Sequence, residues 1–167
     1  MKNQFNINFK YLSFVLCFSS LTLLNPLVSL SQSDDLVNEN ENLLLTEKWL
    51  EAYNTKNWDQ MSDLMADSLH GFIRFEKNIY KPSFPDSHSK KKAIYAEGDM
   101  VFLVGEETAT NSDSLRWMVE SPIPATNVKY NHTWFGAFKW EKGKIVWFRF
   151  HIDGKNIRRQ LGLTKED

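Results

Sequence analysis

His132 is the residue whose type and position best suit acid–base chemistry. It lies in residues 127–140, where apolar and polar side chains alternate as they do along a β-strand. A general acid or base needs a titratable group inside a cleft. His132 is the only ionisable residue on the even-numbered face of the hairpin that residues 127–153 are predicted to form, so we predict it as the catalytic candidate. The alternative is a structural histidine that hydrogen-bonds to backbone or water.

Other side chains with suitable chemistry could join His132 in a cavity. They are Tyr53, Tyr95 and one of Glu106 or Glu107, whichever of the two the alternation of its strand points inward. A carboxylate or a tyrosine hydroxyl next to a histidine would support proton transfer.

A second pair of polar side chains, His151 and Asp153, could bind a metal ion. Two ligands at strand spacing with no third ligand nearby make a weak site. A side-chain pair at a contact between two copies of the chain is the better interpretation, and we predict no metal and no cofactor.

The hairpin must position these residues, because aromatic side chains crowd both of its strands around Glu141-Lys142-Gly143. We predict a three-residue loop that ends at Gly143 and pairs Trp140 with Lys144. In this register one face is apolar except at its His132 end. The predicted ligand-binding residues are Tyr53, His132, Trp134, Phe138, Phe148 and Phe150.

The opposite face of the hairpin mixes rings with charges. Aromatic side chains with an arginine are typical of protein–protein interfaces. We therefore predict a homodimer that associates through this face, and the alternative is a mixed, partly solvated surface. The predicted interface residues are Phe135, Trp147, Arg149 and His151.

The rest of the chain divides into helices followed by strands, which predicts an α+β domain. Apolar spacing predicts helices over residues 42–57 and 58–67, with Asn57 capping the second. Alternation predicts strands in the later segments. They cover residues 69–76, 92–110 with a turn at 97–99, 114–120, 127–140 and 144–153, and an irregular loop or short helix covers 77–91.

The N-terminal segment has the pattern of a secretory signal peptide. Lys2 and Lys10 precede an uncharged stretch that ends in small residues at Ser29 and Ser31. We predict a signal peptide over residues 1–31, a linker over 32–42 and one domain over 43–167, in a periplasmic or secreted protein. An uncleaved membrane anchor is the alternative, because 20 uncharged residues could cross a bilayer.

Composition excludes several classes of function. Cys17, the only cysteine, lies in the predicted signal peptide, so the mature chain has neither disulfides nor thiol nucleophiles. Removing Lys2 and Lys10 from 20 basic residues leaves 18 against 21 acidic residues, a net charge of −3. This balance gives no electrostatic reason to expect nucleic acid, and we expect no membrane contact once the signal is removed.

Four segments resemble the SnoaL-like group of the nuclear transport factor 2-like superfamily. They are "WLEAYNTKNWDQMSDLMAD", "AEGDMVFL", "EKGKI" and "DGKNIRRQLGL", and the resemblance covers residues 43–163. It implies a cone-shaped α+β barrel, in which a curved antiparallel sheet wraps around the N-terminal helices and opens to an apolar pocket. It also implies dimers that associate through the outer face of the sheet.

The resemblance implies the fold more firmly than it implies an activity. The polyketide cyclases of this group use an aspartate and a histidine at positions that correspond here to Phe150 and Gly136, neither of which can transfer a proton. Asp153 matches a second aspartate of the motif, which we interpret as structural. We therefore expect a protein that binds a small apolar or amphipathic molecule. The alternatives are an isomerase, cyclase or dehydratase using His132, and a dimeric interaction module.

Overall fold

The computed structural model describes residues 25–163, with side chains from Asn38 onward. Its elements are α1 (Asn25–Thr55), α2 (Trp58–Asp63), η1 (Asp67–Leu69), α3 (His70–Phe75), the π-helical turn η2 (Glu76–Tyr80), α4 (Lys81–Ser83), β1 (His88–Glu97), β2 (Met100–Thr110), β3 (Lys129–Glu141), β4 (Lys144–Ile152) and α5 (Gly154–Gln160). The predicted signal peptide, residues 1–31, lies mostly outside the described part. Its cleavage stays a prediction.

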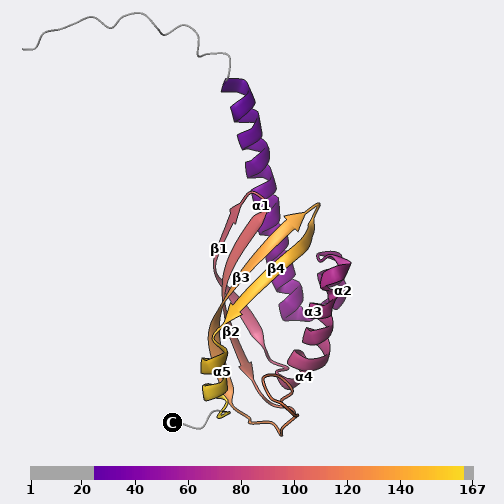
Figure 1. The fold of residues 1–167 in the computed structure, drawn as a ribbon, viewed down its shortest axis with the longest axis vertical. Helices are drawn as coiled ribbons and strands as arrows, with labels where there is room; N and C mark the ends of the chain where they lie inside the picture. Colours follow the sequence, from indigo (N-terminus) through magenta and orange to yellow (C-terminus); the bar gives the residue numbers. More distant parts are fainter. Residues whose placement is uncertain (1–24, 164–167) are drawn as a thin grey trace, which may run out of the picture.

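The four strands form one antiparallel sheet in the order β1-β2-β3-β4, and every strand pairs with its sequence neighbours. The sheet is curved, and α1 to α4 cover its concave face (Figure 1). This confirms the predicted α+β fold with a curved antiparallel sheet around N-terminal helices. The C-terminal part of α1 lies along the sheet, whereas its N-terminal part extends beyond it.

The helix α1 begins earlier than the predicted start at residue 42, so residues 32–42 are helical. Near its middle, Glu39 and Asn42 contact the turn between β1 and β2. The Glu39 carboxylate accepts a hydrogen bond from the backbone of Gly98, and the Asn42 amide donates to the Gly98 carbonyl. None of the helices that the structure describes carries an apolar stretch long enough to cross a bilayer.

Two helix caps follow from side chains that the sequence singles out. Asn57 accepts a hydrogen bond from the backbone of Gln60 at 3.1 Å and caps α2, as predicted. Asp153 accepts from the backbone of Asn156 at 2.9 Å and caps α5. The structural interpretation of Asp153 is therefore confirmed.

Two predicted strands are wrong. Residues 69–76 are mostly helical and form α3, because Leu69, Phe72 and Ile73 turn their side chains to the core at a spacing of three and four residues. Residues 114–120 form no strand and make one isolated bridge, between Leu115 and Ile123. The buried Asn111 holds this loop through hydrogen bonds to the carbonyls of Ser83 and Asp113 and from the backbone of Thr126.

The hairpin of β3 and β4 keeps its predicted faces in a different register. Its loop has two residues, Lys142 and Gly143, both with positive φ, at 51° and 76°. Phe138 pairs with Phe148, and the predicted pairing of Trp140 with Lys144 is therefore wrong. An irregularity between Lys139 and Trp140 compensates for the shorter loop, and it returns the even-numbered side chains to the inner face.

Two clusters of apolar side chains fill the space between the sheet and the helices. The larger cluster contains Trp49, Met61, Leu103, Trp134 and Phe138. The smaller cluster lies around Tyr80, Phe84, Leu115, Tyr130 and Ile157, towards the loop that follows β2. Both clusters contribute side chains to the wall of a cavity between the sheet and the helices.

Candidate functional site

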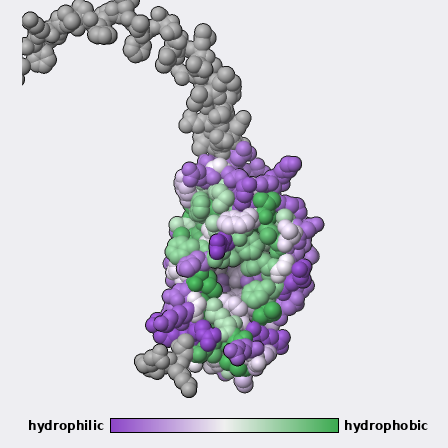
Figure 2. Space-filling view, viewed as in Figure 1, coloured by the Kyte–Doolittle hydropathy of each residue, from purple (hydrophilic) through white to green (hydrophobic). Residues whose placement is uncertain are grey.

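A cavity of about 210 Å³ lies between the inner face of the sheet and the helices α1, α3 and η2. Apolar side chains gather around a hollow in the molecular surface (Figure 2). The cavity is lined by Trp49, Tyr53, Phe72, Phe75, Glu76, Tyr80, Ser89, Glu107, Trp117, His132, Trp134, Phe150 and Ile152. Helices supply one wall, strands supply the other, and the loop after β2 adds Trp117.

Aromatic rings make up most of the wall. Trp49 stacks on Tyr53 and on Phe150, with centroid separations of 5.9 Å in both cases. Phe72 packs against Phe150 at 5.5 Å. Such contacts hold the rings in place and give a rigid apolar surface.

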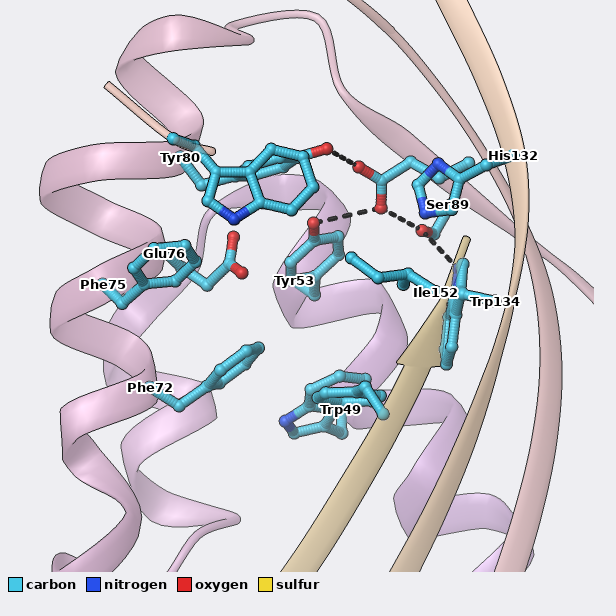
Figure 3. Close-up of a pocket in the computed structure, with 13 residues that line it drawn as sticks. Trp49, Tyr53, Phe72, Phe75, Glu76, Tyr80, Ser89, His132, Trp134 and Ile152 are labelled. Atoms are coloured by element: carbon cyan, nitrogen blue, oxygen red, sulfur yellow. Dashed lines mark hydrogen bonds between the residues drawn. The ribbon is translucent and has the colours of Figure 1, made fainter. Parts of the chain in front are cut away.

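Glu107 is the hydrogen-bond acceptor for the polar side chains at one end of the cavity. Its Oε2 accepts hydrogen bonds from Tyr53 at 3.1 Å and from Ser89 at 2.7 Å, and its Oε1 accepts one from Tyr80 (Figure 3). The Tyr80 hydroxyl also hydrogen-bonds with that of Tyr130. Three donors therefore satisfy both oxygens of this buried carboxylate, which explains how the fold tolerates it.

Trp134 links this network to the apolar wall. Its indole Nε1 donates to Ser89 Oγ at 3.1 Å (Figure 3). The ring lies directly over Gly105, where an added Cβ would come within 2.2 Å of it. Glycine at position 105 is therefore required for the ring to lie flat on β2.

Glu76 is the second buried carboxyl group, and its environment differs from that of Glu107. Its Oε2 has no hydrogen-bond partner among the described residues. Burial raises the pKa of Glu76 to about 8, opposed by the charge of Lys81. Burial likewise lowers the pKa of Lys81 to about 8. The Lys81 ammonium donates to Ser87 Oγ at 2.8 Å and lies 3.6 Å from the centre of the Tyr53 ring.

His132 faces the cavity from β3, opposite the helical wall that carries Glu76. It stacks on Tyr130 at 5.6 Å, and its Nδ1 has no hydrogen-bond partner among the described residues. Burial lowers the pKa of His132, opposed by the charge of Glu107. The ring is therefore neutral at pH 7.

The positions that correspond to the acid and base of the polyketide cyclases are apolar and face each other. Gly136 pairs directly with Phe150 across the hairpin. A Cβ at Gly136 would lie 2.9 Å from the rings of both Trp134 and Phe138, so those rings occupy the space that a side chain there would need. The polar groups of this cavity lie elsewhere, around Glu107.

The structure brings four of the six predicted ligand-binding residues to the cavity: Tyr53, His132, Trp134 and Phe150. It corrects the other two. Phe138 is fully buried in the core, and Phe148 packs against Phe72 at 5.0 Å outside the cavity wall. These rings support the wall from behind, because the hairpin register places them closer to the turn.

Of the proposed companions of His132, Tyr53 and Glu107 reach the cavity. Glu107 is the inward member of its pair, since it alternates with the half-exposed Glu106 along β2. Tyr95 is 60% exposed on the outer face of β1 and takes no part.

The helical wall of the cavity differs from the prediction made from the sequence. Phe72, Phe75, Glu76 and Tyr80 all line the cavity, but the alternating pattern of residues 69–76 predicted a strand. The signal that could have found them is their spacing of three and four residues, which is that of one helix face.

The outer face of the sheet carries the predicted interface residues. Phe135 and Trp147 are 53% and 44% exposed, and Arg149 and His151 lie beside them on β4. Phe102 on β2 adds a further exposed ring to this surface. Within the described residues, no group of three or more metal-binding side chains occurs, and Asp153 accepts a hydrogen bond at the start of α5.

Comparison of the fold with solved structures gives clear relatives, although the sequence matches no family model and no curated protein. A candidate hydroxylase from Streptomyces galilaeus is 18% identical, with a TM-score of 0.66 over 76% of this chain and 99% of its own. A candidate SnoaL-like polyketide cyclase from Jannaschia sp. CCS1 is 12% identical, also at 0.66, over 76% and 95%. An LEH-like epoxide hydrolase from M. tuberculosis is 14% identical at 0.54, over 74% and 90%.

These proteins share the sheet and the helices with this chain. Their described activities differ from one another, and few of their residues are identical to those of this chain. At such identities, the likeness concerns the fold alone. The chain therefore shares the fold of these structures, among them a candidate SnoaL-like polyketide cyclase, which is the fold that the resemblance of its sequence segments predicts.

Proposed function

We propose that this protein binds a small, mostly apolar molecule in the cavity between the sheet and the helices. The observation that carries the proposal is the aromatic wall of that cavity, which has polar groups at one end. Apolar walls with a few fixed polar groups are the usual form of a ligand site. The apolar pair Gly136 and Phe150 supports binding over the proton transfer of the cyclases.

The proposal is tested by filling the cavity. Ile152→Trp puts a large ring into the cavity from the end of β4, whereas Thr133→Trp adds the same ring on the outer face of β3. We expect wild type and Thr133→Trp to bind toluene in isothermal titration calorimetry, and Ile152→Trp to bind it at least tenfold more weakly. Equal toluene affinity in both variants, with both folded by circular dichroism, would contradict the proposal.

An acid–base enzyme of the isomerase, cyclase or dehydratase type is the second candidate. Two observations favour it: Glu76 has a raised pKa and an unpartnered oxygen, and His132 faces the same cavity. Perturbed carboxyl groups in clefts are common at catalytic sites. A hydrogen bond between His132 and a second ionisable group would strengthen it, and the described residues contain none. Turnover that is lost in His132→Ala, with toluene binding retained, would establish the enzyme.

We also propose that the domain works outside the cytoplasm, in the periplasm or after secretion. The charge and small-residue pattern of residues 1–31 supports a cleaved signal peptide. Intact-mass analysis of the exported protein tests it. A chain that keeps Met1 would contradict cleavage.

The outer face of the sheet supports a homodimer as a further part of the proposal. Exposed rings of Phe102, Phe135 and Trp147 lie together there, with Arg149 and His151 among them. Contiguous apolar surface of this kind is costly on a monomer.

A further inference from the structure

Two buried polar atoms in the cavity lack a partner in the chain. They are Glu76 Oε2 on η2 and His132 Nδ1 on β3, in residues that are only 5% and 8% exposed. Both residues line the cavity, one on the helical wall and one on the sheet wall. A buried polar atom without a hydrogen bond is destabilising, so a ligand that supplies the missing partner gains affinity.

The other polar groups at this end are already occupied. Glu107 accepts from three hydroxyl groups, and the Lys81 ammonium donates to Ser87. A ligand that entered with a negative charge would meet the Glu107 carboxylate and find no free cation among the described side chains of the cavity wall. An uncharged ligand avoids this cost.

The protonation of the two unpartnered groups fits a neutral ligand. Lys81, Glu107 and Tyr53 all face Glu76: burial, together with the charge of Glu107, outweighs Lys81 and Tyr53 and raises the pKa of Glu76 to about 8. Glu76 is therefore a carboxylic acid at pH 7 and donates a hydrogen bond. His132 is neutral, because burial lowers its pKa, and the imidazole has one acceptor and one donor nitrogen.

The volume of the cavity fits a ligand with one ring. An apolar cavity of about 150 Å³ holds benzene in another protein. The cavity here, at about 210 Å³, has room for one six-membered ring and a short substituent.

We propose that the ligand is a neutral molecule of single-ring size with a hydroxyl or carbonyl oxygen, and that the unpartnered group of Glu76 on one wall, or that of His132 on the other, selects for this oxygen. This inference rests on the proposed binding function and specifies its ligand class. The apolar body of the ligand lies against Trp49, Phe72 and Phe150, and its oxygen lies at the polar end.

Four probes of the same size test the ligand class: benzyl alcohol, toluene, benzoate and benzylammonium. Calorimetric titration of the full chain at pH 7 should give benzyl alcohol an affinity about 5- to 10-fold above that of toluene, the value of one additional hydrogen bond. Benzoate and benzylammonium should bind more weakly than benzyl alcohol. If toluene equals benzyl alcohol, or if either ion binds more tightly, the inference is overturned while the binding function stands. If none of the four binds, both fail.

Variants test which residue causes the preference for a ligand with an oxygen atom. In Glu76→Leu or in His132→Phe, whichever removes the group that bonds to the probe's oxygen, the ratio of benzyl alcohol affinity to toluene affinity should fall towards one, with toluene affinity retained. Glu51→Leu, an exposed position on α1, is the matched control and should keep the wild-type preference. A preference that survives in both Glu76→Leu and His132→Phe would overturn the assignment. The wild-type probe series remains decisive if either variant fails to fold.

Discussion

Glu76 and Lys81 are the residues at which burial and charge are most sharply opposed. Each is almost fully buried, and burial shifts the pKa of both towards about 8 from opposite sides. The charge of Glu107 adds to the rise in the Glu76 pKa and opposes the fall in the Lys81 pKa. A pair of this kind lowers stability in the pH range where the folded chain cannot keep both groups charged.

The pair predicts a minimum of stability near pH 8. From about pH 4.5 to 8 the folded Glu76 holds a proton that the unfolded chain has released, so the free energy of unfolding falls as pH rises. From about pH 8 to 10.5 the folded Lys81 has lost a proton that the unfolded chain keeps, so the free energy of unfolding rises again.

Urea unfolding of the wild type and of Glu76→Gln/Lys81→Met between pH 5 and 10 measures this effect. The free energy of unfolding of the wild type minus that of the variant should pass through a minimum near pH 8. Taking this difference removes the contributions of His132 and the tyrosines, which both proteins share. A flat or steadily rising difference would contradict the proposed ionisation of the pair.

At the scale of elements, the hairpin shows what the sequence can specify. Alternation along β3 and β4 predicted which side chains face inward, and that sorting is confirmed except at Ile145, which was predicted on the outer face but is buried opposite Trp140; the register is not confirmed. The loop length could not be predicted, because a bulge in β4 conceals it from the pattern. The helix α3 was missed for a related reason. Phe72, Ile73 and Phe75 have high strand propensity, and only contacts with the core make them helical.

Gly105 tests how β2 positions the cavity wall. Gly105→Ala should push the Trp134 ring away from the strand, because the new Cβ would lie 2.2 Å from it, and should break its hydrogen bond to Ser89. We expect a loss of about 1–3 kcal/mol in the free energy of unfolding and weaker toluene binding. Urea unfolding and calorimetry measure the two effects.

Gly71→Ala is the matched control for this variant. Its new Cβ would meet nothing closer than the Arg74 side chain at 3.7 Å, and it lies in the helix α3. Alanine is favoured over glycine in a helix by about 0.5–1 kcal/mol, so Gly71→Ala should be as stable as the wild type or slightly more so. Equal stability of the two variants would show that the position of the Trp134 ring does not require a glycine at position 105.

At the scale of the whole molecule, the sheet separates two surfaces with different roles. The same strands present Trp134 and Phe150 to the cavity and Phe135 and Trp147 to the exterior. Alternation in the sequence predicted both surfaces.

Trp147→Glu tests the homodimer through the outer face. Burying a carboxylate against Phe102, Phe135 and their counterparts in a second copy would cost several kcal/mol, so this variant should be a monomer in light scattering at micromolar concentration. Leu44→Glu, which changes an exposed apolar side chain on α1, is the matched control and should remain a dimer. A monomeric wild type would refute the homodimer. A dimeric Trp147→Glu would move the interface to another surface. Because the two faces belong to the same strands, toluene binding that persists in the monomeric variant would show that the cavity functions within one copy.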